Sequence, residues 1–216
     1  PVATALGKLD AFNLFDPYWM DPEYDLWYAM LNCGFRLPAS TGSDWFVCSA
    51  NRVYAYTGAP FTYPDWTAAL QAGRTFISNG PAIFMNVEGQ GVGETVDCDG
   101  GSALTVTASW QSHYSVEVVE LLWNGAVVAS RRVEGVNAKA GELTVSFNPP
   151  SDGWLAARLS SHVRDSFFQP VYAHTSPIYV RTGQPSPEQP KAAAFFERSI
   201  DEALVWVNQK AKFRND

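Results

Sequence analysis

Short apolar runs alternate with helical patterns along the first third of the chain. Residues 9–15 predict a strand, and residues 36–40 and 53–56 predict two more. Residues 24–33 predict a helix, because apolar side chains recur there at spacings of three and four: Leu26, Trp27, Met30 and Leu31. Gly34 follows where a left-handed C-terminal cap is needed, so it is expected to end this helix.

A second helix is expected to begin near Pro64 and to end at Gly73. Proline suits the first turn of a helix, and Trp66, Ala69 and Leu70 share one of its faces. Strands and helices that alternate in this way indicate βα units over residues 1–81.

The pattern changes to closely spaced β-type runs over residues 82–181. The dipeptide Asn124-Gly125 is the strongest hairpin signal, because both turn residues must reach positive φ. The expected strands cover residues 83–87, 104–110, 116–123, 126–133, 143–147, 154–159 and 177–180. Seven or eight strands in a hundred residues predict an immunoglobulin-like antiparallel β-sandwich.

The C-terminal part predicts a linker and then a helix. Residues 182–190 contain three prolines among small or polar residues, as linkers do. Residues 191–216 carry an apolar stripe at helical spacing: Phe196, Ile200, Leu204, Val207 and Ala211. We expect this amphipathic helix to pack on the α/β part, with a membrane-surface or partner-binding helix as the alternative.

Composition and charge exclude several classes of protein. The chain has 216 residues, 46% of them hydrophobic and 17% charged, as globular proteins do. Its net charge of −7 argues against binding to nucleic acid or to anionic lipid. No apolar run reaches the length of a membrane helix. Cys33, Cys48 and Cys98 are scattered and are interpreted as structural thiols, and the compartment, cytoplasmic or exported, stays open.

Familiar catalytic motifs are missing from the sequence. The three histidines have neither the H-x-H spacing nor the i, i+4 spacing that brings two imidazoles to one metal. There is no nucleophile elbow, no phosphate-binding loop and no dinucleotide fingerprint. Residues 89–93, with three glycines, predict a hairpin turn instead.

Four residues are candidates for a site. Asp44 follows a predicted strand, where barrel enzymes place metal ligands and acid/base groups, although Asp after Gly-Ser also caps helices and closes turns. Arg52 and Arg74 lie near strand starts and could bind a carboxylate or form ordinary ion pairs. His174, flanked by hydroxyl residues, is either a substrate-facing group or a hydrogen-bonded structural residue.

Four sequence blocks, in order, resemble a known family. They are LNCGFRLPASTGSD at residues 31–44, NRVY at 51–54, ALQAGRTFISNGP at 69–81 and AHTSPIYV at 173–180. Together they resemble the C-terminal half of the CehA/McbA-type metallohydrolases, a branch of the PHP (polymerase and histidinol phosphatase) superfamily that includes carbamate-ester hydrolases.

This resemblance implies an α+β fold: the end of a distorted PHP-type β/α barrel over residues 1–81, a β-sandwich over 82–181 and the C-terminal helix. The barrel would hold divalent metals (Zn, Mn or Fe), whose bound hydroxide attacks an ester, carbamate or phosphoester. Asp44 matches a late barrel aspartate that ligates metal in the family. Trp45 and Phe46 stand where the pattern often has His.

The family's H-x-H and its further Glu and His ligands have no counterpart in this chain. We therefore expect this chain to be a C-terminal fragment of a metal-dependent hydrolase. By itself it is expected to be inactive, because a catalytic metal needs about three protein ligands. The incomplete barrel would expose strand edges and favour self-association.

Two other functions compete with the hydrolase hypothesis. A non-enzymatic β-sandwich module could bind sugar or a protein partner through exposed aromatics such as Trp110, Tyr114 and Trp123. The other alternative is an assembly role, in which the C-terminal helix or the open barrel edge recruits another polypeptide.

Overall fold

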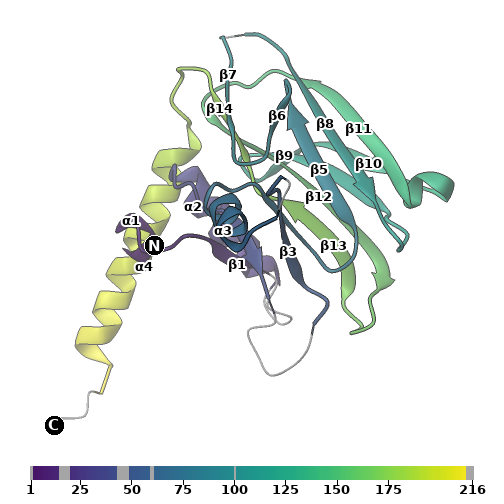
Figure 1. Cartoon of the computed structure of the whole chain (residues 1–216). Helices are drawn as coiled ribbons and strands as arrows, with labels where there is room; N and C mark the ends of the chain where they lie inside the picture. The colour runs from purple at the N-terminus through teal and green to yellow at the C-terminus, as the bar shows by residue number, and fades with distance from the viewer. Residues whose placement is uncertain (1, 15–19, 43–48, 59–60, 100, 213–216) are drawn as a thin grey trace.

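In the residues that the structure describes, three sheets and a C-terminal helix form an α+β structure that is mostly β (Figure 1). The computed structural model describes residues 2–14, 20–42, 49–58, 61–99 and 101–212. The helices are α1 (Val2–Ala5), α2 (Met20–Asn32), α3 (Tyr63–Gln71) and α4 (Glu188–Gln209), with a 3₁₀ turn, η1, at Gly135–Ala138. The strands are β1 (Phe12–Leu14), β2 (Ala39–Thr41), β3 (Arg52–Ala55), β4 (Thr75–Ser78), β5 (Ala82–Val87), β6 (Gln90–Gly91), β7 (Thr95–Asp97), β8 (Leu104–Gln111), β9 (Val118–Trp123), β10 (Ala126–Arg132), β11 (Ala140–Phe147), β12 (Gly153–Arg164), β13 (Pro170–Thr175) and β14 (Ile178–Arg181).

The two larger sheets form a β-sandwich. The smaller has the order β11-β8-β5-β6, and the larger has the order β10-β9-β12-β13-β4-β3, with β14 and β7 continuing it beside β12. Alternate residues of both sheets point into the space between them, where they form one apolar core. Val106, Trp110, Leu121 and Leu155 are among its buried members. The predicted sandwich is therefore present.

A helical layer covers the outer face of the larger sheet. Strands β1 and β2 pair in parallel, with α2 between them in sequence, so they form a βαβ unit. Trp27 and Leu31 of α2 pack with Leu122 and Trp154 of the sheet in a second apolar core. The middle of the larger sheet is thus buried on both faces, which explains the nearly continuous burial along the first half of β12 and along β13.

The larger sheet crosses the boundary that we expected at residue 81. Strand β4 pairs with β13, and β3 pairs with β4, so two strands from the N-terminal part belong to the same sheet as the sandwich strands. Residues 1–81 and 82–181 are joined by main-chain hydrogen bonds as well as by packing. Strand β13, which was outside the predicted set, is the element that makes this connection.

Local turn signals agree with the structure where they were strongest. Asn124 and Gly125 have φ of 50° and 91°, and they join β9 to β10 as a two-residue hairpin turn. Gly34 has φ of 93°, and its N–H donates to the carbonyl of Leu31 at 2.9 Å, as a left-handed cap does. The glycines of residues 89–93 lie in the β5–β6 hairpin region, as predicted.

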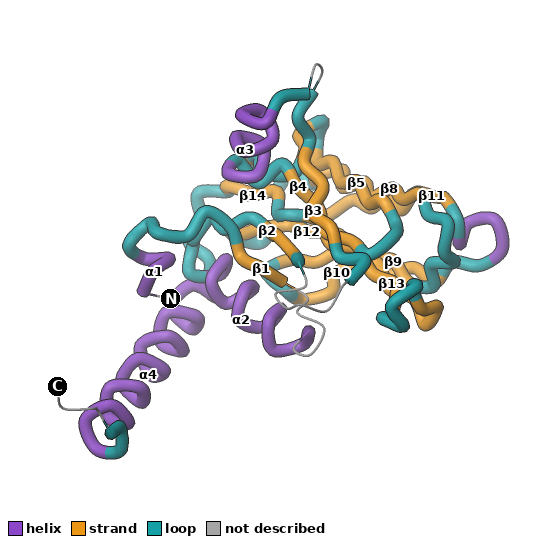
Figure 2. Tube along the Cα trace, turned by 60° about the horizontal axis from the view of Figure 1, so that its bottom comes forward, coloured by secondary structure: helices purple, strands orange, loops and turns teal. Residues whose placement is uncertain are grey.

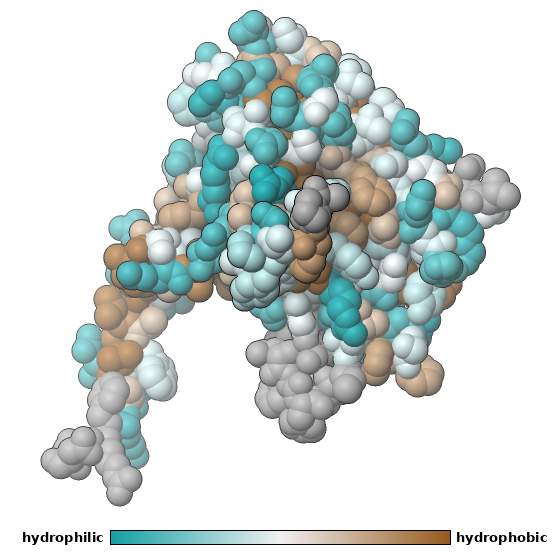
Figure 3. All heavy atoms as spheres, viewed as in Figure 1, coloured by the Kyte–Doolittle hydropathy of each residue, from teal (hydrophilic) through white to brown (hydrophobic). Residues whose placement is uncertain are grey.

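Helix α4 packs on the helical layer through its first half. It begins at Glu188, three residues before the predicted start, and its Ala192 and Phe196 are buried. Its second half projects away from the sheets (Figures 1 and 2), and Leu204 and Trp206 are 53% and 57% exposed there. Apolar surface is visible along the projecting helix in Figure 3. Only part of the predicted stripe therefore packs on this chain.

No helix in the described residues is long and apolar enough to cross a membrane.

Candidate functional site

The carboxyl ends of β1 and β2 lie side by side because the two strands run in parallel. The register pairs Leu14 with Thr41, and the Thr41 hydroxyl donates a hydrogen bond to the Leu14 carbonyl at 2.5 Å. In β/α folds, functional side chains gather beyond the carboxyl ends of parallel strands. We call this end of the βαβ unit, from Leu14 and Thr41 to the adjacent Tyr172, the carboxyl edge.

Tyr172 places a phenol at the carboxyl edge. Its hydroxyl lies 3.5 Å from the Thr41 hydroxyl, and the residue is only 5% exposed. Burial raises the pKa of Tyr172 far above its ordinary value, and the negative charges of Asp165 and Glu23 raise it further. Tyr172 is therefore a neutral hydrogen-bonding group at any physiological pH.

Asn79 holds the backbone of Tyr172 in place. The Asn79 side-chain oxygen accepts the Tyr172 N–H at 2.8 Å, and its amide nitrogen donates to Asp165 at 2.9 Å and to the Pro170 carbonyl at 2.9 Å. Asp165 also accepts the N–H groups of Phe167 and Gln169, so its turn is fixed. The hydrogen-bonded side chains of Asn79 and Asp165, both buried, consequently hold the Tyr172 backbone and thereby position its phenol.

Asp44, the predicted metal ligand, lies outside the described residues. Strand β2 ends at Thr41, and Asp44 stands three positions later in the sequence.

Arg52 is found at the same end of the molecule as the carboxyl edge. It pairs with Ser78 in the β3–β4 ladder, and Ser78 donates its hydroxyl to the Tyr172 carbonyl at 3.1 Å. The Arg52 guanidinium donates to the carbonyls of Ser49 and Asn51, at 3.0 and 2.7 Å. These bonds hold the guanidinium against the segment just before β3, while the residue as a whole stays exposed.

Arg74 is found at the opposite end of the same ladder. Its neighbour Thr75 pairs with Ala55, whereas Arg52 pairs with Ser78, so the two arginines are separated by the length of β3, roughly 10 Å. The structure does not bring Arg52 and Arg74 together in one site.

His174 is completely buried on the outer face of the larger sheet. The Tyr28 hydroxyl lies 2.6 Å from Nε2, and Nδ1 lies 2.7 Å from the Thr175 carbonyl. Because a carbonyl only accepts, Nδ1 carries the proton and Nε2 accepts from Tyr28. Burial lowers the pKa of His174 to about 3, so the ring is neutral. This arrangement agrees with the interpretation of His174 as a hydrogen-bonded structural residue rather than a substrate-facing group, because no part of His174 reaches the surface.

The aromatics considered for sugar stacking are mostly core residues. Trp110 and Trp123 are 1% and 8% exposed and belong to the sandwich core, and Tyr114 is half-buried. Neither indole can present a free face to a sugar ring. Alternate residues of a strand share a face, but alternation by itself does not show whether a given aromatic faces inward.

Within the described residues, no three His, Cys, Asp or Glu side chains are grouped so that they could hold a metal ion. This part of the chain therefore does not fit a complete metal centre, and we assign no catalytic step to a metal here. Cys33 and Cys98 are free thiols, and burial raises the pKa of each, so neither is an activated thiolate.

Tyr172 and Glu23 were not among the residues selected from the sequence. Tyr172 stands two positions before His174, so on one strand the two side chains must share a face, and this spacing was an available signal. Glu23 lies in α2, and nothing in the sequence connects it with a tyrosine far along the chain.

Comparisons with known proteins give little further guidance. No protein-family model matches the chain, and no curated protein matches it. Among solved structures, the chain is similar to a lytic polysaccharide monooxygenase from Jonesia denitrificans, with a TM-score of 0.27 and 10% identity over 71% of this chain and 92% of that chain. At this level the similarity carries no argument about function.

Proposed function

We propose that this chain is the C-terminal portion of a metal-dependent hydrolase of the CehA/McbA type, acting on an ester, a carbamate or a phosphoester. The observation that supports the proposal is the parallel β1–α2–β2 unit, whose carboxyl edge leads directly toward the segment that contains Asp44. A parallel βαβ unit is the building block of β/α barrels. The four family-like sequence blocks supply the rest of the argument.

In this proposal Asp44 is one metal ligand of the complete enzyme, and the H-x-H and the other ligands come from preceding residues that are not in this chain. Bound metal would supply a hydroxide nucleophile at neutral pH. Tyr172 would contribute a neutral phenol beside that site, and Arg52 a fixed positive charge at the same end. The chain by itself would not turn over substrate.

The first test is to read the coding frame upstream of the Pro1 codon. The proposal expects an open frame of a hundred or more codons that includes H-x-H. A stop codon in frame close to Pro1, with no H-x-H between, overturns it.

The second test uses the complete enzyme and p-nitrophenyl acetate, an aryl carbamate and p-nitrophenyl phosphate as substrates. Asp44→Asn should lower kcat/KM by at least about a hundredfold and reduce the bound metal measured by elemental analysis, because a ligand is lost. Asp10→Asn is the matched control, since Asp10 is exposed and its carboxylate accepts a hydrogen bond from Gln71 at 3.5 Å. Full activity and metal content in Asp44→Asn would remove Asp44 from the site.

A further inference from the structure

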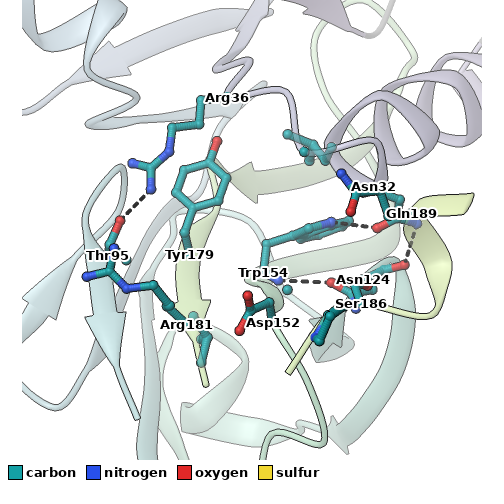
Figure 4. Close-up of a pocket in the computed structure, with 15 residues that line it drawn as sticks. Asn32, Arg36, Thr95, Asn124, Asp152, Trp154, Tyr179, Arg181, Ser186 and Gln189 are labelled. Atoms are coloured by element: carbon teal, nitrogen blue, oxygen red, sulfur yellow. Dashed lines mark hydrogen bonds between the residues drawn. The ribbon is translucent and has the colours of Figure 1, made fainter. Parts of the chain in front are cut away.

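A cavity of about 480 Å³ lies where three parts of the chain meet (Figure 4), and its lining does not include the carboxyl-edge residues Leu14, Thr41 and Tyr172. Its walls come from the end of α2 and the segment after it, from the edge of the sandwich, and from the start of α4. This volume falls within the range of small-molecule sites. The residues that matter for its chemistry are Arg36, Asn124, Asp152, Tyr179, Ser186 and Gln189.

Two carboxamides of the cavity are each anchored at one end. The Asn124 side-chain oxygen accepts the Trp154 N–H at 2.9 Å, and the Gln189 side-chain nitrogen donates to the Cys33 carbonyl at 3.2 Å. The opposite atoms, Asn124 Nδ2 and Gln189 Oε1, have no partner within the described residues. Two residues that line the cavity therefore each keep one unused group, a donor on Asn124 and an acceptor on Gln189.

Asp152 and Ser186, like the two carboxamides, are each anchored by a hydrogen bond and keep a second group unused. Oδ1 of Asp152 accepts the N–H groups of Thr182 and Gly183 at 2.6 and 2.9 Å, while its Oδ2 has no partner in the part of the chain that is described. The Ser186 oxygen accepts the Glu188 N–H at 3.4 Å, which leaves its O–H free to donate. Each side chain is positioned by the protein and keeps one group for a ligand.

Arg36 provides further donors on the other side of the cavity, beside Tyr179 (Figure 4). Its guanidinium carbon lies 4.3 Å from the centre of the Tyr179 ring, and one nitrogen donates to Thr95 at 2.6 Å. The stacking leaves the remaining N–H groups in a fixed plane. Arg181, which also lines the cavity, is ion-paired with Asp97 at 2.6 Å.

We propose that this cavity binds a neutral mono- or disaccharide. Each hydroxyl of a sugar is both a donor and an acceptor, so it satisfies donors such as Arg36, Asn124 and Ser186 next to acceptors such as Asp152 and Gln189. Asp152 and Arg36 carry opposite charges that compensate each other, and this balance favours a neutral ligand over an anion. The site is separate from the proposed hydrolase site and does not depend on that activity.

The test is saturation-transfer difference NMR and calorimetry on the chain as it exists, with glucose, galactose, xylose, maltose and cellobiose as probes. At least one should bind saturably. Arg36→Met and Gln189→Leu should each weaken that binding by about tenfold, since each removes a ligand hydrogen bond. Arg131→Met, an exposed arginine on β10 that donates to the Glu142 carbonyl, is the matched control and should bind as the wild type does.

Three results would overturn the proposal. The first is no saturable binding of any probe, and the second is unchanged binding in both cavity variants. The third is binding of sodium glucuronate with none of the neutral sugars, which would assign the cavity to anions. Because Gln189 is exposed at the start of α4, Gln189→Leu keeps the test valid if Arg36→Met fails to fold.

Discussion

The two faces of the larger sheet are built from alternate residues of the same strands, yet they are held by different forces. The inner face presents Leu121, Leu155 and Ala173 to the other sheet, in a core that is almost entirely apolar. The outer face presents Tyr172 and His174 to α2. The inner face is therefore stabilised by close packing, and the outer face by packing together with specific hydrogen bonds.

This difference matters because hydrogen-bonded polar groups respond to pH and to the loss of one partner, whereas aliphatic side chains respond to lost volume. The outer face also adjoins the carboxyl edge, through Tyr172. The same sheet thus has one almost entirely apolar face and one face with buried polar groups next to the carboxyl edge.

The largest expected effect comes from a cavity in the inner face. Leu121→Ala should lower the free energy of unfolding by about 2–5 kcal/mol, because a fully buried side chain is truncated in a packed core. Urea unfolding followed by circular dichroism measures it. Val127→Ala, on the exposed side of neighbouring β10, should cost far less. Equal losses in the two variants would contradict the assignment of the inner face as the main core.

Acid should weaken the outer face through His174. Its folded pKa of about 3 is below the unfolded value of about 6.5, so the unfolded chain binds the proton first. Stability contributed by the neutral ring is complete well above pH 6.5 and falls as the pH decreases, by about 1.6 kcal/mol between pH 6.5 and pH 5.

Urea unfolding across this pH range checks the effect, and His174→Gln should flatten the dependence. His113→Gln, at an exposed position, should leave the slope as it is in the wild type. A wild-type slope that His174→Gln does not change would refute the prediction.

Tyr28→Phe should destabilise the outer face by about 1–2 kcal/mol. The substitution removes the hydroxyl that donates to His174 Nε2 and leaves that buried nitrogen without its partner. Thermal and urea unfolding measure the loss, and Tyr63→Phe, at a 73% exposed tyrosine, is the control. A loss no greater than that of the control would mean that the hydrogen bond contributes nothing.

The smallest effect is expected in the projecting half of α4, which belongs to neither face. Leu204→Ser should change the free energy of unfolding by no more than about 0.5 kcal/mol, because this side chain is already in contact with water. Phe196→Ala, in the packed half of the same helix, should cost several times more. A large loss in Leu204→Ser, measured at low protein concentration, would show that the projecting half is packed in solution.

Much of the secondary structure was predictable because its causes are local. The hairpin at Asn124-Gly125 and the helix end at Gly34 depend on conformations that few residues adopt, so two or three positions suffice to indicate them. Strict alternation likewise indicated β8 and β11. The short strands β1 and β2 were expected with longer bounds, since weak patterns locate ends poorly.

The candidate site was less predictable. Arg52 and Arg74 looked equivalent in the sequence, and only the β3–β4 register shows that they lie at opposite ends of one ladder. The hydroxyl residues next to His174 in the sequence left open whether it faces a substrate or the interior, and only the structure places it inside β13, where Tyr28 of α2 contacts it.

The sequence by itself determined the turns, most of the helices and strands, and the presence of a sandwich, because backbone preference and side-chain alternation act between near neighbours. Only the tertiary structure decided that β3 and β4 join the sandwich sheet, that one face of that sheet carries buried polar groups, and that Arg36 and Gln189 line the same cavity. Those arrangements depend on pairing between residues far apart in the chain, which is selected by the packing of whole elements rather than by any short segment.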